Sequence, residues 1–264
     1  MISELADTVD SLPILSVPVV LASAYFLSAE IGFRFHRRFG GGTDNGAEDE
    51  SQVLSTALLV LALLLGFTFS MALGRYDERR QLVVQEANDI GTAWLRAGLV
   101  PAPHGPELQR ALADYARVRQ TSPLPHETGK LARAATLRDA MWRETAAAQA
   151  QLDGARAASL VGAVNNVIDT GTTRERAVAA RVPAEVMLLL ILFSCVACFL
   201  LGYVLDAHGH RHRVASGILF LLMGLTIMLI LDLDRPSDGA IRVDQTAMRD
   251  LVKGLDGAAV TVQD

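Results

Sequence analysis

Four long apolar segments, almost free of charged side chains, constrain this chain more than any other feature. They run from about Pro13 to Phe33, Val53 to Leu73, Val186 to Val204 and Val214 to Leu231. At about 1.5 Å of rise per residue, helices of this length span roughly 27–32 Å, which matches a hydrocarbon core of about 30 Å. Core helices of a soluble protein rarely lack charge over such lengths. The sequence therefore predicts four transmembrane helices.

The first apolar segment resembles a secretory signal peptide in its length. Its N-terminal flank, however, carries Glu4, Asp7 and Asp10 and no basic residue, whereas a signal peptide begins with a basic stretch. We therefore expect this segment to be retained as a membrane span. The glycine-rich, acidic segment 40–51 that follows is expected to be a flexible loop.

About 110 residues of mixed polarity separate the second and third apolar segments. Apolar side chains recur there at helical spacing from Val83 to Ala97, and no helix breaker separates them from the second apolar segment. The second segment should therefore continue out of the membrane as one helix to about Leu99. Further helices are expected up to Pro183, with a short final helix capped by Asp244. The predicted division is 1–74 (two spans), 75–182 (helical extramembrane domain), 183–235 (two spans) and 236–264 (tail).

Composition and motifs exclude several functional classes. The net charge of −5 is unfavourable for coating nucleic acid, and we found no catalytic motif, so an enzyme is not expected. His208, His210 and His212 could bind a metal, but alternate residues of an exposed loop need none, and Cys195 and Cys198 lie within an apolar segment. We therefore expect neither a cofactor nor a metal.

Two polar stripes fall on helices next to the membrane. Glu86 and Arg79 share one face of the long helix, seven residues apart. The stripe on the later helix consists of Asn165, Asp169, Thr172 and Arg176. Interhelical ion pairs or a solvated face would explain both stripes. A polar lining for ions at the membrane mouth is the alternative.

An apolar stripe marks the second span. Leu59, Leu63 and Phe67 lie four residues apart, with Thr68 and Ser70 close by. In a symmetric oligomer such a stripe would stack apolar rings around the axis, and rings of this kind can gate a pore by dewetting. A packing or lipid-facing stripe is the simpler alternative for a single helix.

Several long motifs resemble one family of bacterial membrane proteins. They are LGFTFSMALGRYDERR (65–80), QEANDIGTAWLRA (85–97), NNVIDTGTTRERAVAARVP (165–183) and LDLDRPSDGAIRV (231–243). Together they are similar to the DUF4239 family, whose members are also called bestrophin-like proteins. The resemblance covers the chain from about residue 10 to residue 255. It implies an all-α membrane protein with four transmembrane helices and a helical domain between helices 2 and 3.

The resemblance to true bestrophins, which are pentameric ion channels with a helical cytosolic domain, suggests a function. It implies a homo-oligomer such as a pentamer in the bacterial inner membrane, with the lipid bilayer and small ions as partners and the helical domain in the cytoplasm. The pore constriction would be Leu59, Leu63 and Phe67, with the hydroxyls of Thr68 and Ser70 beside it. Arg75, Arg79 and Arg80 would surround the mouth and weakly favour anions.

Calcium control and membrane orientation are two further properties on which the resemblance bears. The acidic residues after the fourth span, Asp232, Asp234 and Asp238, are interrupted by Arg235, so calcium control is not expected. Basic residues on both sides of the membrane give conflicting signals for orientation. The alternative function is a non-conducting membrane scaffold or sensor whose helical domain binds a partner protein.

Overall fold

The structure, a computed structural model, describes residues 16–39, 44–120, 128–207, 213–235 and 239–261. Every regular element in these ranges is helical, and four helical stretches are long and apolar enough to cross a membrane. The protein is thus an all-α membrane protein, as the sequence predicts. It divides into two compact units, residues 1–74 with 182–235 (unit 1) and residues 75–181 with 236–264 (unit 2).

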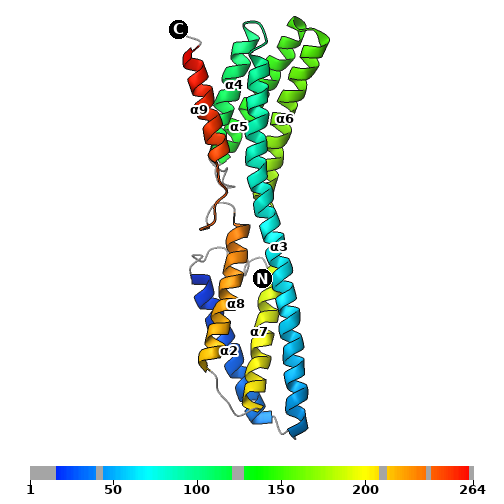
Figure 1. Ribbon diagram of the computed structural model, residues 1–264, viewed down its shortest axis with the longest axis vertical. Helices are drawn as coiled ribbons and strands as arrows, with labels where there is room; N and C mark the ends of the chain where they lie inside the picture. Colours follow the sequence, from blue (N-terminus) through cyan, green and yellow to red (C-terminus); the bar gives the residue numbers. More distant parts are fainter. Residues whose placement is uncertain (1–15, 40–43, 121–127, 208–212, 236–238, 262–264) are drawn as a thin grey trace. The chain divides into compact units, whose positions relative to one another are not determined.

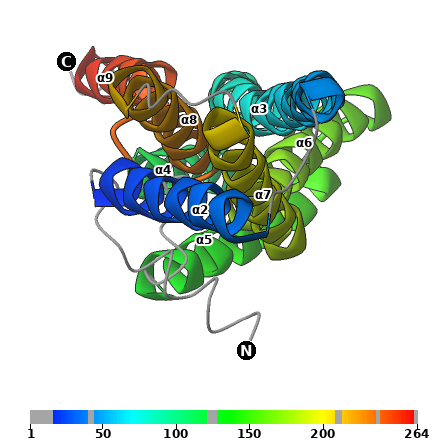
Figure 2. The same ribbon diagram turned by 90° about the horizontal axis from the view of Figure 1, so that it is seen from below.

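Unit 1 contains helices α2 (Val17–Phe39), α7 (Ala184–Ala207) and α8 (Arg213–Asp234), together with the first part of α3 (Asp44–Ala97). Helix α2 packs along both α7 and α8, and these helices run side by side (Figure 1, Figure 2). Near the expected membrane boundary, Arg34 donates to Glu30 at 3.0 Å. This ion pair satisfies the one acid within the first apolar segment.

Helices α2 and α7 touch through their backbones. A Cβ atom added at Gly32 would collide with the carbonyl of Phe199, and one added at Gly202 would collide with the carbonyl of Ala29. The Ser28 hydroxyl also crosses between the helices and donates to the Cys195 carbonyl at 2.7 Å. Small residues permit this close approach, which is a common basis of helix packing in membranes.

The entry to α7 is fixed to the end of α8. Helix α6 (Gly154–Ala179) ends before Pro183, and α7 begins directly after it. The backbone N–H of Val182 has no intrahelical partner there, and it donates to a carboxylate oxygen of Asp234 at 2.9 Å. Asp234 is therefore a structural side chain that joins two spans of unit 1.

Unit 2 is a bundle of α-helices around one apolar core. It holds the rest of α3, then α4 (His104–Arg119), α5 (Thr128–Ala148), the 3-10 turn η2 (Gln149–Gln151), α6 and α9 (Thr246–Thr261). Fully buried side chains from different helices meet in this core, among them Ile90, Leu112, Met141 and Val164. The core fixes which face of each helix points inward.

Two local predictions can be compared with the helix ends. The N-cap of the last helix is Gln245, whose carbonyl accepts from the Arg249 N–H, and not Asp244 as predicted. Asp244 lies one residue earlier, and its carboxylate accepts the backbone N–H of Thr246 at 2.9 Å. The segment 40–51 is not a loop throughout, since α3 begins at Asp44. The prediction of a loop rested on the glycines of this segment, but its Asn, Ala and Glu residues are compatible with the first turns of a helix.

Candidate functional site

Helix α3 buries one continuous face along most of its length. The buried side chains recur every three, four or seven residues: Leu61, Thr68, Ala72, Arg79, Val83, Glu86, Ile90, Ala93 and Ala97. This spacing follows the 3.6-residue helical repeat. Leu61, Thr68 and Ala72 carry this spacing in unit 1, and Arg79 to Ala97 carry it in unit 2.

The opposite side of α3 is exposed over the same length. We call it the open face. It consists of Leu59, Leu63, Phe67, Ser70, Gly74, Asp77, Gln81, Val84, Asn88, Thr92 and Leu95 on α3, with Leu99 in the turn directly after the helix. Over about 40 residues at about 1.5 Å each, it extends for roughly 60 Å. The open face is therefore available to line a path or to meet another copy of the chain.

The predicted constriction residues belong to the open face. Leu59, Leu63 and Phe67 are exposed, and Phe67 leaves 65% of its surface uncovered. Ser70 is exposed on the same side. Thr68 requires a correction, because it is 4% exposed and lies on the buried face, with its hydroxyl donating to the Leu64 carbonyl at 2.8 Å. One helical residue turns the side chain by about 100°, which is enough to take Thr68 away from its neighbour Phe67.

The three arginines predicted at the mouth do not share one environment. Arg80 is exposed and Arg75 is partly exposed, whereas Arg79 is buried. The Arg79 guanidinium donates to the carbonyls of Ala177 at 3.1 Å and Ala180 at 2.9 Å. The last carbonyls of a helix lack intrahelical partners, so Arg79 caps the C-terminal end of α6. Its assignment as a mouth charge is corrected accordingly.

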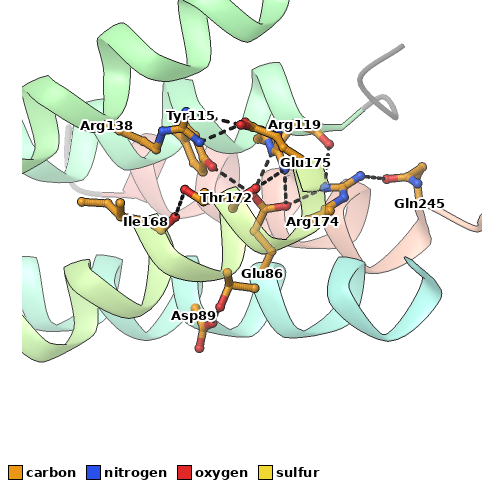
Figure 3. Close-up of polar contacts among 12 residues, drawn as sticks. Glu86, Asp89, Tyr115, Arg119, Arg138, Ile168, Thr172, Arg174, Glu175 and Gln245 are labelled. Carbon is orange, nitrogen blue, oxygen red and sulfur yellow. Dashed lines mark hydrogen bonds and ion pairs between the residues drawn. The ribbon is translucent and has the colours of Figure 1, made fainter. Parts of the chain in front are cut away.

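Among the described residues of unit 2, the most buried charged side chain is that of Glu86. It has no exposed surface, and it accepts hydrogen bonds from three side chains of other helices (Figure 3). The Tyr115 hydroxyl donates at 2.9 Å, Arg119 at 2.8 Å and Arg174 at 2.6 Å. A buried charge is costly unless it is paired and hydrogen-bonded, and Glu86 satisfies both conditions. Helices α3, α4 and α6 are therefore joined at one point.

A second carboxylate extends this network towards the surface. Glu175 accepts from Arg119 at 3.0 Å and from Arg138 of α5 at 2.9 Å (Figure 3). Arg174 reaches the other way and donates to the side-chain carbonyl of Gln245, just before α9, at 2.6 Å. The network thus connects α3, α4, α5 and α6 with the residue that directly precedes α9.

The network leaves no room for a side chain at Gly171. A Cβ atom there would collide with the Tyr115 hydroxyl and would lie 3.1 Å from a carboxylate oxygen of Glu86. The Gly171 carbonyl also accepts from Arg119 at 3.3 Å. The glycine of the TGT segment is therefore required by packing, because α6 brings its backbone directly against the buried polar groups.

The ionisation of these groups follows from burial and from Glu86. Burial, followed by the charge of Glu86, raises the pKa of the Tyr115 hydroxyl, which therefore stays protonated and donates. Burial is the largest single effect on Arg119 and lowers its pKa, but Glu86, Tyr115 and Glu175 together outweigh it, so the net pKa is raised. Burial dominates at Arg174, whose pKa is lowered. An arginine still keeps its proton at neutral pH, so the network contains charged partners.

The stripe predicted on α6 lies on the wrong side of that helix to join the network. Its members, Asn165, Asp169, Thr172 and Arg176, are exposed or partly exposed. The inward side of α6 instead carries Thr170, Gly171 and Arg174, and Thr170 donates to Asp89 at 2.7 Å. Exposure fits both a solvated face and a polar lining for ions, so the role of this stripe stays a prediction. Glu86 does form interhelical ion pairs, which was a predicted interpretation, but its partners are Arg119 and Arg174, which lie outside the predicted stripes.

Sequence reasoning missed Arg119, Arg174, Tyr115 and Gln245. Arg174 could have been found, because it follows the apolar series of Leu160, Val164, Val167 and Gly171 at helical spacing and so belongs to the buried face of α6. No comparable signal marks Gln245, which lies outside any helix. No group of metal-ligating side chains occurs in the described part of the chain, and the predicted histidine positions 208–212 lie outside it.

Comparison with known proteins gives the family of this chain. Two crystal structures of a bacterial Bestrophin homolog from Klebsiella pneumoniae each have a TM-score of 0.65 at 17% identity. They cover 92% of this chain and 98% and 97% of their own chains, respectively. At this identity they show the fold alone. No curated protein matches the chain. A family model of the bestrophin-like domain matches residues 24–248, and the chain therefore belongs to the bestrophin-like family.

Proposed function

We propose that this protein is a passive ion channel, in which several copies surround an axis and the open face of α3 lines the path. The observation that carries the proposal is the exposure of apolar side chains on α3 beyond the membrane-spanning length. Among the described residues of unit 2, the exposed large apolar side chains are Val84, Leu95, Leu99 and Trp142. Three of these four belong to the open face.

Apolar side chains that stay exposed to water do not stabilise a protein, whereas their burial by another molecule does. Exposed apolar patches on soluble surfaces mark interaction sites, and Leu95 and Leu99 are 67% and 71% exposed. Copies of α3 arranged around an axis would turn these side chains towards the axis, where they would narrow the path and face one another across it. Symmetric homo-oligomers are the commonest assemblies of identical chains, and membership of the bestrophin-like family supports this arrangement.

The narrowest part of the path would lie at Leu59, Leu63 and Phe67. These side chains project from the open face, within the most apolar stretch of α3. Rings of apolar side chains exclude water when they are narrow, and they gate conduction in this way. The polar members Ser70, Gln81 and Asn88 follow along the same face, where their hydroxyl and amide groups would contact a permeating ion or its water shell.

Membership of the bestrophin-like family and the four apolar helices support a membrane location. We place it in the bacterial inner membrane, with unit 2 in the cytoplasm. The anion preference expected from the sequence loses part of its basis, because Arg79 is a buried capping residue and cannot face the ions.

Flux measurements in proteoliposomes test the proposal. We expect potassium or chloride flux from the wild-type protein and a flux several-fold higher in Phe67→Ala, whose smaller side chain widens the constriction. Phe26→Ala is the matched control, because Phe26 is also exposed but lies on α2. Absence of flux from folded, oligomeric protein would refute conduction. Equal flux in wild type and Phe67→Ala would refute the position of the constriction.

A non-conducting scaffold or sensor is the second candidate, and it rests on the same exposed stripe. Leu95 and Leu99 could be covered by a different protein instead of by a second copy. Single cysteines at these positions distinguish the two cases. Disulfide cross-linking between identical chains in membranes would support the oligomeric axis, while its absence, together with absence of flux, would favour the scaffold.

A further inference from the structure

We propose that Asp77 makes the path selective for cations, an inference that rests on the proposed function of conduction along α3. Asp77 follows Leu59 by eighteen residues, and eighteen residues make five complete turns of 3.6 residues. The two side chains therefore leave α3 in the same direction. Gln81 has the same relation to Leu63, so this register holds at two points.

Asp77 is the one charged member of the open face. The other members between Leu59 and Leu99 are apolar, glycine, or neutral polar side chains such as Ser70, Gln81 and Asn88. Asp77 is exposed, and within the described ranges its carboxylate has no hydrogen bond or ion pair. Its negative charge is therefore not neutralised inside the subunit.

The neighbouring arginines do not oppose this charge on the open face. Arg79 lies on the buried face and is bound to the Ala177 and Ala180 carbonyls. Arg75 follows Leu59 by sixteen residues, which turns it by about 160° from the direction of Leu59. Arg80 is turned by about 60° to one side of that direction. The pKa of Asp244 is lowered mainly by its hydrogen bonds to Thr246, and the charge of Arg80 is the smallest of the contributing causes.

Symmetry multiplies the effect of one carboxylate. In an oligomer each copy contributes an Asp77 to the same level of the path, and the apolar constriction lies on one side of it. Rings of acidic side chains favour cations in channels, and a narrow passage with low-dielectric walls strengthens the field of such charges. The geometry thus points to cations, in contrast to the anion preference expected from the sequence.

Reversal potentials under a potassium chloride gradient test this assignment. We expect the wild-type channel to favour potassium over chloride. Asp77→Asn should lower the permeability ratio by roughly tenfold, which corresponds to about 1.4 kcal/mol, and Asp77→Lys should reverse the preference. Asp139→Asn is the matched control, because Asp139 is an exposed acid on α5. All of these side chains are exposed, so each variant should remain folded and oligomeric.

The outcomes separate this inference from the proposed function. A conducting wild type whose ratio is unchanged in Asp77→Asn and in Asp77→Lys would overturn the role of Asp77 and leave conduction intact. A wild type that favours chloride would also overturn it. No current from any variant would refute conduction itself, and the inference with it. A change in Asp139→Asn equal to that in Asp77→Asn would show that the effect is not specific to the open face.

Discussion

Replacing Glu86 with glutamine tests whether the buried network holds unit 2 together. The substitution keeps the size of the side chain and removes its charge. Glu86 accepts from Tyr115, Arg119 and Arg174. A glutamine has one acceptor oxygen, and its NH2 group can only donate. The NH2 group would therefore face an arginine guanidinium, which has no acceptor atom either.

The expected cost can be worked from these contacts. Hydrogen bonds to charged groups contribute about 1.5–3 kcal/mol each. Arg174 loses its carboxylate partner, and Arg119 keeps only its pair with Glu175. Removal of one partner from a buried ion pair typically costs about 3–5 kcal/mol. A loss of this size is a large share of a typical domain stability of about 5–15 kcal/mol. For a chain of this size each kcal/mol lowers the melting temperature by roughly 2–4 °C.

The measurement is thermal unfolding in detergent, followed by circular dichroism. We expect Glu86→Gln to lower the melting temperature by roughly 6–20 °C. Glu107→Gln, an exposed position on α4, is the control and should stay within about 0.5 kcal/mol of wild type. If Glu86→Gln melts with the wild type, Glu86 does not hold the charged network and our account of unit 2 is refuted.

Three further predictions concern unit 2. Gly171→Ala should destabilise the protein by about 1–3 kcal/mol, because the added Cβ displaces Tyr115. Gly162→Ala is the control, and it should stabilise the protein by up to about 1 kcal/mol, because nothing lies within 4 Å of its added Cβ. Equal melting temperatures of the two variants would contradict this account. Arg79→Met should expose the last turn of α6 to faster amide exchange, since the Ala177 and Ala180 carbonyls lose their donor; unchanged exchange there would exclude the capping role. The pKa of Asp244 is lowered by its hydrogen bonds to Thr246, so its contribution to α9 should be present at neutral pH and be lost as the pH falls through this lowered pKa. In Asp244→Asn that acid-induced loss should vanish, and an identical pH profile would refute it.

The fold could be predicted because hydrophobicity alone determines much of it. Segments such as Val214–Leu231 are long and uncharged, and the spacing of Val83, Ala87 and Ile90 defines a helix face without further information. The network could not be predicted in the same way. Arg174 and Arg176 differ by two residues in sequence and by about 200° around the helix, and only the packing of α6 shows which of them faces Glu86.

The contact between α2 and α7 determines how the membrane unit can deform. At Gly32 and Gly202 the two backbones are in direct contact, so no side chain lies between them that could change its rotamer. The hydrogen bond from Ser28 to the Cys195 carbonyl adds a fixed link. The two helices should therefore move as a single body. Spin labels on their outer surfaces would then report one unchanging separation, whatever the conducting state.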